Sequence, residues 1–173
     1  ITGTVAPRFT GTYTMKVDAK GRMSVPAAFR RVLEANDDAS AGEDFSAMQV
    51  IVGPHLRNCL QVYHMAAYDD ILDNAELLPR GTPERKRFED LFVVSAIEMK
   101  IDKDGRLVMP ARLREKMGLL EGELTFTGRV DHFEIRASET HEAVEADLNE
   151  WLDAQGEDFD PLTLLPPRTV GAP

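Results

Sequence analysis

An acidic and a basic residue recur at one spacing in two places in this sequence. Asp18 and Arg22 stand four residues apart, and Asp102 and Arg106 repeat that spacing. An aspartate in a tight loop accepts hydrogen bonds from backbone N–H groups, and glycine permits the positive φ that such a loop needs. Arginine on a rigid loop can contact phosphate or read guanine bidentately. We expect two basic tips, organised by Asp18, Gly21, Asp102 and Gly105, that present Lys16, Lys20, Arg22, Lys100, Lys103 and Arg106.

Residue patterns typical of catalysis are absent. The sequence has no G-x-S-x-G elbow, P-loop, dinucleotide-binding glycine motif or H-E-x-x-H pair. His55, Cys59 and His64 come nearest to a metal-binding pattern, but thiolate zinc sites normally show paired cysteines. We therefore expect no catalytic residue, metal, cofactor or small-molecule substrate, and a protein that is not an enzyme.

The two acidic–basic pairs belong to a longer internal repeat. Residues 15–31 (MKVDAKGRMSVPAAFRR) align with residues 99–115 (MKIDKDGRLVMPARLRE) at a constant offset, and eight positions are identical. Apolar residues alternate on both sides of each loop, which predicts a strand before it and a short strand after it, joined as a hairpin. A proline then begins a helix in each copy. Two copies are too few for a solenoid, so they predict one pseudo-symmetric domain.

Each copy continues with a second pair of strands and a further helix. In the first copy we expect a helix over 26–35, strands over 48–52 and 59–63, and a helix over 65–78. In the second copy we expect a helix over 110–117, strands over 124–127 and 132–135, and a helix over 139–154. Thr82 and Pro83 begin a linking helix between the copies. We expect the apolar stripe in the last helix to pack into the core rather than to bind a partner; it comprises Val144, Leu148, Trp151 and Leu152.

The negative charge is concentrated at one end of the chain. The net charge is −10, yet residues 1–136 carry only −2, and residues 137–167 hold nine acids with no lysine or arginine. An acidic chain in general argues against nucleic-acid binding, but this segment lies apart from the basic tips. The concentration of charge therefore leaves nucleic-acid binding open.

Composition and hydropathy indicate a globular protein with no membrane segment. Hydrophobic residues make up 43% of the chain, and no apolar run reaches the length of about 18 residues that a membrane helix needs. Residues 1–8 lack the pattern of a signal peptide, and a single cysteine allows no internal disulfide, so we expect a cytoplasmic protein. Residues 36–46 are predicted to be a mobile loop, and residues 155–173 a disordered tail.

The doubled motif closely resembles the MraZ family. The resemblance rests on Asp18-Ala-Lys-Gly-Arg22-Met-Ser-Val-Pro26 and Asp102-Lys-Asp-Gly-Arg106-Leu-Val-Met-Pro110, and covers about residues 9–151. It implies an α+β, mainly β fold, a double swapped-hairpin AbrB-like barrel built from both repeats with helices outside. The implied boundaries are a first repeat at 9–81, a linking helix at 82–95, a second repeat at 96–154 and a tail at 155–173.

The resemblance also implies a function. MraZ proteins form ring-shaped homo-oligomers and bind double-stranded DNA at repeated promoter boxes near the cell-division and cell-wall gene cluster, where they regulate transcription, usually as repressors. Their DNA-contacting residues correspond here to Lys20, Arg22, Lys103 and Arg106, and the implied location is the nucleoid. Copy two carries Asp104 where copy one has Lys20, so the first tip is expected to dominate binding. The alternative is an AbrB-like antitoxin or protein-interaction module that uses the acidic C-terminal segment.

Overall fold

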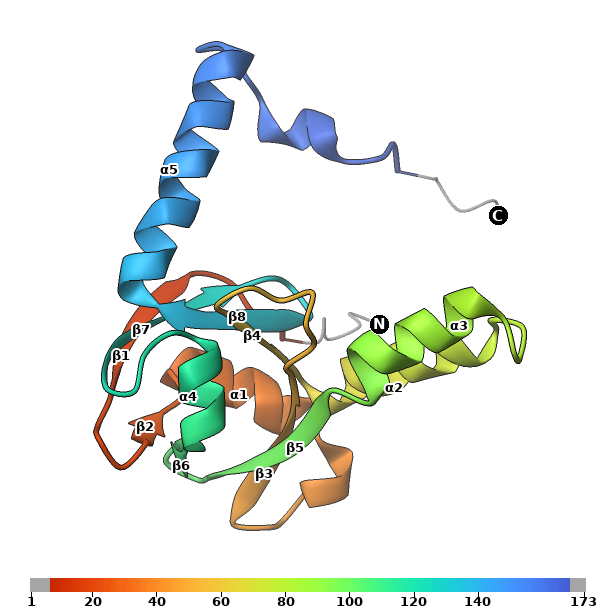
Figure 1. Ribbon diagram of the computed structural model, residues 1–173, viewed down its shortest axis with the longest axis vertical. Helices are drawn as coiled ribbons and strands as arrows, with labels where there is room; N and C mark the ends of the chain where they lie inside the picture. The colour runs from red at the N-terminus through yellow and green to blue at the C-terminus, as the bar shows by residue number, and fades with distance from the viewer. Residues whose placement is uncertain (1–6, 169–173) are drawn as a thin grey trace, which may run out of the picture.

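A computed structural model of the chain describes residues 7–168 (Figure 1). It is an α+β fold in which one curled, antiparallel six-stranded sheet and a two-stranded ribbon enclose the core. The order in the large sheet is β1-β7-β8-β4-β3-β5, and β2 pairs with β6. This order reads the same from either end when each strand is exchanged for its counterpart in the other repeat. The sheet therefore has the pseudo-twofold symmetry that the sequence repeat predicts.

The two repeats supply equivalent elements. The first contains β1 (Thr12–Val17), β2 (Arg22–Ser24), α1 (Ala27–Ala35), β3 (Phe45–Ile51), β4 (Leu60–Tyr63) and α2 (Met65–Glu76). The second contains β5 (Ala96–Asp102), β6 (Arg106–Val108), α4 (Ala111–Lys116), β7 (Gly122–Gly128), β8 (His132–Ala137) and α5 (Ser138–Gln155). Between them lie α3 (Pro83–Phe88) and a π-helical segment, η2 (Glu89–Val93). Thr82 caps α3 through its side chain and Pro83 begins the helix, as predicted.

The strand pairing around the two loops differs from the local prediction. The loops are tight, but β1 does not form a hairpin ladder with β2; it pairs with β7, and β2 pairs with β6. Likewise β5 pairs with β3 of the first repeat. The prediction of a local hairpin was wrong because each short strand buries its apolar residue against the equivalent strand of the other repeat: Met23 lies opposite Leu107. The swapped pairing implied by the family resemblance is the one observed.

Two apolar clusters stabilise the fold. The larger fills the curled sheet and includes Phe9, Phe29, Phe126 and Phe133, whose rings pack at centroid distances of 4.9–5.7 Å. The smaller joins α2 to η2, where Tyr68 stacks on Phe92. The segment that links the two repeats therefore packs on the body of the protein through Phe92.

The last helix departs from the sequence prediction. α5 has no buried residue, and Figure 1 shows it projecting away from the sheet. Leu148, Trp151 and Leu152 are 55%, 42% and 38% exposed, so the expectation that this stripe packs into the core was wrong. The stripe follows helical spacing, but α5 leaves β8 at an angle that carries its outer turns beyond the sheet.

Two segments expected to be irregular contain ordered structure. In residues 36–46 there is a 3-10 turn, η1 (Asp38–Ser40), and the buried Asp37 carboxylate accepts a hydrogen bond from the Ala47 N–H at 2.7 Å. The tail contains η3 (Pro161–Leu164), and Phe159 packs edge-on against Trp151. Residues 169–173 of the tail and residues 1–6 lie outside the described residues. Over 7–168, none of the helices combines the length and apolar character needed to cross a bilayer.

Candidate nucleic-acid interface

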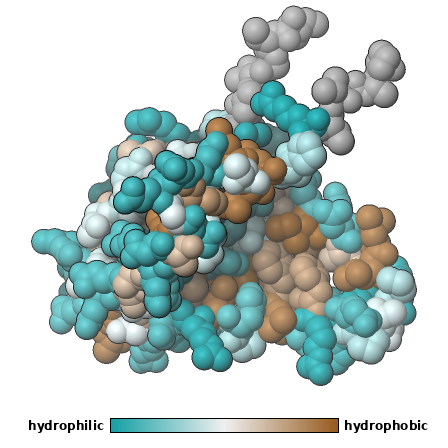
Figure 2. Space-filling view, turned by 90° about the horizontal axis from the view of Figure 1, so that it is seen from above, coloured by the Kyte–Doolittle hydropathy of each residue, from teal (hydrophilic) through white to brown (hydrophobic). Residues whose placement is uncertain are grey.

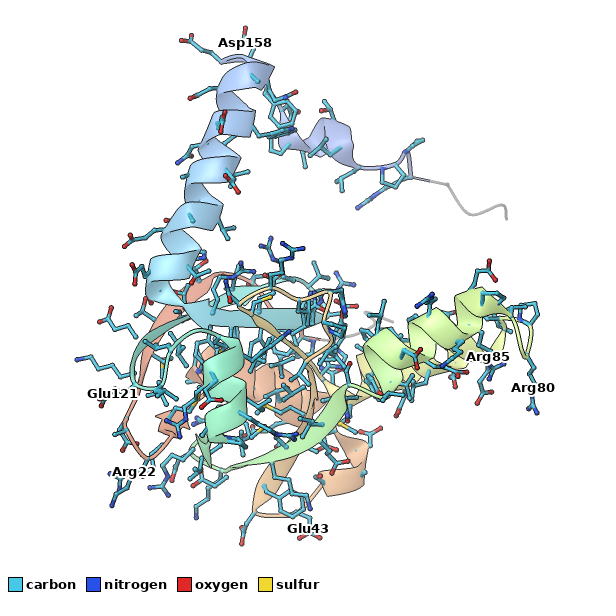
Figure 3. The ribbon with its side chains drawn as sticks, in the orientation of Figure 1. Arg22, Glu43, Arg80, Arg85, Glu121 and Asp158 are labelled. Atoms are coloured by element: carbon cyan, nitrogen blue, oxygen red, sulfur yellow. The ribbon has the colours of Figure 1, made fainter. Side chains whose placement is uncertain are left out.

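The first loop is organised by Asp18. Its Oδ1 accepts hydrogen bonds from the backbone N–H groups of Lys20 and Arg22 at 3.0 and 2.9 Å, and its Oδ2 accepts one from Arg22 Nε at 2.5 Å. The Arg22 side-chain hydrogen bond is the main reason that the pKa of Asp18 lies below its ordinary value. The contact uses Nε, and Figure 3 shows Arg22 pointing away from the body. Its terminal nitrogens are therefore held outward on a braced side chain.

The second loop repeats this geometry with one difference. Asp102 accepts from the Asp104 and Arg106 N–H groups and from Arg106 Nε, each at 2.9 Å. The Arg106 N–H is the main cause of the lowered pKa of Asp102, and the hydrogen bond to Asp102 is the main cause of the raised pKa of Arg106. Arg106 Nη2 also lies 3.3 Å from Asp104 Oδ2. The second guanidinium is thus more fully neutralised than the first.

The ribbon of β2 and β6 holds the two loops side by side. Arg22 lies opposite Val108, and Ser24 lies opposite Arg106. Each loop also bonds to the strand end of the other repeat: the Met109 N–H donates to Gly21 O at 2.7 Å, and the Val25 N–H donates to Gly105 O at 2.8 Å. The pseudo-twofold axis therefore passes through the ribbon, and both arginines lie on its outer side.

A groove runs along the outer side of the ribbon. Its volume is about 550 Å³, and its lining combines apolar side chains with Lys16, Arg22 and Arg106 and with the acidic Asp102. The side chains of Arg22 and Arg106 are 65% and 67% exposed. A two-stranded ribbon that carries exposed arginines matches in size and chemistry a reader of the DNA major groove.

The structure places the remaining candidate lysines differently from one another. Lys20 is exposed at the first tip. Lys100 Nζ lies 4.2 Å from the centroid of the Phe45 ring, a cation–π contact that holds it on β5. Lys103 borders a small hollow formed with the acidic 36–46 segment, including Glu43 and Asp44. Of the predicted set, Lys16, Arg22 and Arg106 thus share the groove, and Lys103 faces an acidic neighbour instead.

Sequence reasoning missed Arg114 as a positioning residue for the first tip. It is 7% exposed, and its guanidinium donates to Met109 O at 3.0 Å, Leu120 O at 2.6 Å and Ala19 O at 3.3 Å. Ala19 belongs to the first loop, so α4 of one repeat supports the tip of the other. The repeat contained the signal, because Arg30 and Arg114 are identical at equivalent positions. Arg30 itself is half-buried and lies 3.7 Å from Glu34.

The residues closest to a metal-binding pattern have other roles. His64 Nδ1 accepts the Ala67 N–H at 3.0 Å and caps α2. Burial is the main reason that the pKa of His64 lies below its ordinary value. Cys59 is buried, and burial raises the pKa of its thiol. Within residues 7–168, no three His, Cys, Asp or Glu side chains cluster as metal ligands would.

Comparison with known sequences connects this geometry to a family. The profile described as "MraZ protein, putative antitoxin-like" matches twice, over residues 8–91 and 92–159. The chain belongs to the MraZ family. The double match coincides with the two repeats and places one basic tip in each. The swapped strand pairing joins these two matched segments into one sheet and one ribbon.

Relatives from several bacteria match most of the chain. The transcriptional regulator MraZ of Ruegeria pomeroyi is 41% identical over 93% of this chain and 96% of its own length. The transcriptional regulators MraZ of Cereibacter sphaeroides (strain ATCC 17025) and Leuconostoc citreum are 38% and 32% identical, over 93% and 88% of this chain and 97% and 99% of their own lengths. Their names point to a role in regulation rather than catalysis.

Proposed function

We propose that this chain is a transcription regulator that binds double-stranded DNA through the ribbon of β2 and β6. The observation that carries the proposal is the pair of braced, exposed arginines on one face of that ribbon. Arg22 is held by Asp18 and Arg106 by Asp102, so little side-chain entropy is lost when either contacts a base or phosphate. Membership of a family whose relatives are named transcriptional regulators supports it.

The finer proposal concerns target and assembly. The chain acts as a repressor at repeated boxes upstream of the cell-division and cell-wall gene cluster, and it binds them as a ring-shaped homo-oligomer in the nucleoid. A single ribbon offers few phosphate contacts, and the chain is acidic overall. Several tips on one assembly raise the effective concentration of each next contact, which compensates for weak individual binding.

The first tip contributes more than the second. Lys20 and Arg22 give it two cations, whereas Asp104 sits 3.3 Å from Arg106 and offsets part of that charge. We therefore expect Arg22→Ala to abolish specific binding and Arg106→Ala to weaken it. Arg57→Ala is the matched control, because Arg57 is exposed in the segment between β3 and β4, outside the groove.

Fluorescence anisotropy across a salt series tests the proposal, with labelled duplex DNA from upstream of the gene cluster and a scrambled duplex for comparison. Each lost phosphate contact lowers the slope of log affinity against log salt by about 0.9. A parallel mass measurement confirms that the variants keep the parent assembly. Binding by Arg22→Ala that equals the parent's on the specific duplex would refute the role of this tip.

The antitoxin alternative predicts a different partner for the same chain. Its supporting feature is the acidic, exposed α5, which carries six Asp and Glu residues and no lysine or arginine. The antitoxin alternative predicts the outcome of two successive deletions, first of residues 156–173 and then of the outer turns of α5. Together they would abolish capture of a partner protein and leave DNA binding unchanged. Loss of DNA binding alone on deletion would count against it.

A further inference from the structure

The outer turns of α5 carry an apolar face that the described chain does not cover. Trp151, Leu148 and Leu152 line one side of the helix and remain exposed, and the nearest aromatic contact is Phe159 from the tail. Figure 2, which views the molecule from above, shows apolar patches set between hydrophilic residues on this side of the molecule. Most helical stability in proteins comes from packing an apolar face rather than from helix propensity. The uncovered apolar face of this 18-residue helix, which has no buried side chain, therefore favours a partner.

The acidic side chains of α5 also favour a partner surface. Its six Asp and Glu residues include several pairs spaced three apart, such as Glu139 and Glu142, and like charges at this spacing destabilise a helix. Within residues 7–168, the acids of α5 have one basic neighbour at ion-pair distance, His141, whose Nε2 lies 3.4 Å from Oε1 of Glu145. A basic surface would relieve this repulsion, so the chemistry of the missing partner is both apolar and cationic.

The equivalent helix of the first repeat shows how such a face is covered. α2 follows β4 as α5 follows β8, and α2 packs against α3 and η2 through Tyr68, Phe88 and Phe92. Arg85 joins the pair by donating from Nη1 to Leu78 O at 2.9 Å. In the second repeat no described element covers α5 in this way. The repeat therefore indicates a helical neighbour for α5 as well.

A surface with the required chemistry is present elsewhere on the same molecule. The far end of the α2–α3 pair surrounds an open hollow of about 890 Å³, whose lining includes Arg80, Arg85, Lys86 and Arg87 together with Glu89 and Asp90. Arg85 pairs with Glu89 at 2.8 Å and Lys86 with Asp90 at 3.1 Å, so Arg80 and Arg87 supply the cationic character. Figure 3 shows Arg80 at the tip of this pair, on a different side of the molecule from α5. Neither Arg80 nor Arg87 makes an ion pair within residues 7–168. Leu77, 80% exposed, lies just before this end and adds an apolar contact.

We propose that α5 of one copy docks on the basic end of the α2–α3 pair of the next copy, with Trp151 at the hollow bordered by Arg80 and Arg87. An indole can stack on an arginine side chain while the acids of α5 face the surrounding cations. Two different surfaces meet, so the contact is head-to-tail. An open chain of copies keeps one of each surface unused, at its two ends, until the assembly closes. The contact gives the oligomer of the proposed function its interface, but it does not depend on DNA binding.

Two variants and their mixture test the direction of the contact. The α5 variant is Leu148→Glu/Trp151→Glu, and the α2–α3 variant is Arg80→Glu/Arg87→Glu. The charge-matched control is Arg31→Glu/Arg57→Glu. By mass photometry and native mass spectrometry, we expect the parent and control to be oligomers and each variant alone to be a monomer. An equimolar mixture regains one intact interface and gives a heterodimer and nothing larger.

Trp151 is the only tryptophan of the chain, so its fluorescence reports on the proposed interface directly. We expect the emission of Trp151 to shift to the blue as the parent assembles. In the α2–α3 variant the emission should remain that of a solvent-exposed tryptophan at every concentration. A chain truncated after Gly156 should assemble as the parent does. Loss of assembly on this truncation would identify the tail as the partner and overturn the proposal.

Other outcomes also decide the matter. If the α2–α3 variant remains oligomeric while the α5 variant becomes monomeric, two α5 helices contact each other, and the head-to-tail arrangement is refuted. Circular dichroism confirms that each variant is folded, as expected for substitutions at exposed positions. Binding to a duplex with a single box separates this test from the proposed function, because monomeric variants should retain that weaker binding.

Discussion

Gly21 brings the loop of the first basic tip into close contact with the backbone of the other repeat. Its φ is +84°, and an added Cβ would lie 2.4 Å from the carbonyl oxygen of Met109. That oxygen belongs to the backbone and cannot rotate away as a side chain could. The Gly21 carbonyl also accepts the Met109 N–H at 2.7 Å, so relieving the clash weakens a bond between the two repeats.

The expected cost of Gly21→Ala follows from these contacts. A left-handed alanine costs about 1–2 kcal/mol, from which about 0.4–1 kcal/mol is recovered because alanine restricts the unfolded chain. Losing the hydrogen bond adds about 1 kcal/mol, and the backbone displacement adds more. We expect the free energy of unfolding to fall by about 3 kcal/mol. Gly81→Ala is the control, because φ is +78° but no atom lies within 4 Å of the new Cβ, so about 1 kcal/mol is expected.

Urea unfolding at one fixed protomer concentration measures the difference, since assembly makes apparent stability depend on concentration. Gly105→Ala should be intermediate, because its Cβ would meet Val25 O at 3.0 Å instead of 2.4 Å. DNA affinity should fall for Gly21→Ala even where the protein is fully folded. If Gly21→Ala and Gly81→Ala cost the same within about 0.5 kcal/mol, the close approach of the repeats at this loop does not limit stability, and the reasoning fails.

Three further predictions concern other residues of the fold and the tips. Arg114→Met should lower the free energy of unfolding by about 3 kcal/mol, because it removes the donor to the buried Met109 carbonyl and to the part-buried Leu120 carbonyl. Arg30→Met at the equivalent position should cost under about 1 kcal/mol, and thermal and urea unfolding compare the two variants. The folded-state pKa of His64 lies below its ordinary value of about 6.5, so the folded protein favours the neutral imidazole that caps α2. This contribution to the free energy of unfolding is fully present above pH 6.5 and is lost as the pH falls from there to the folded-state pKa. His64→Asn keeps a hydrogen-bond acceptor at the cap but removes the titrating group, so the dependence of Tm on pH between 8 and 5 should become flatter. An unchanged profile would show that His64 does not cause this dependence. Asp104→Lys should tighten DNA binding and steepen the slope of log affinity against log salt by about 0.9, and Lys20→Asp should do the reverse. Equal affinities of the two variants in fluorescence anisotropy would show that the charge of the tips does not control DNA binding.

Local chemistry in the sequence determined the elements and the loops. Asp18 and Gly21 specify a tight turn by their hydrogen-bonding and φ preferences, and Thr82 with Pro83 specifies a helix start, so these were predictable from neighbouring residues alone. The constant offset between the repeats likewise predicted a pseudo-symmetric domain. The family resemblance added the swapped barrel, which the alternation of apolar residues by itself did not distinguish from a pair of local hairpins.

Tertiary structure decided which strand each short segment pairs with, and what remains exposed. β2 meets β6 rather than β1 because pairing across the repeats buries Met23 against Leu107, a contact between residues far apart in the chain. The same long-range packing buries Arg114 beneath the first tip, while Arg30 at the equivalent position stays half-buried. In α5 the stripe that contains Trp151 satisfies the spacing of a core helix, yet its burial depends on the direction in which α5 leaves β8. Periodicity states which face of a helix is apolar, and only the arrangement of neighbouring elements states what that face meets.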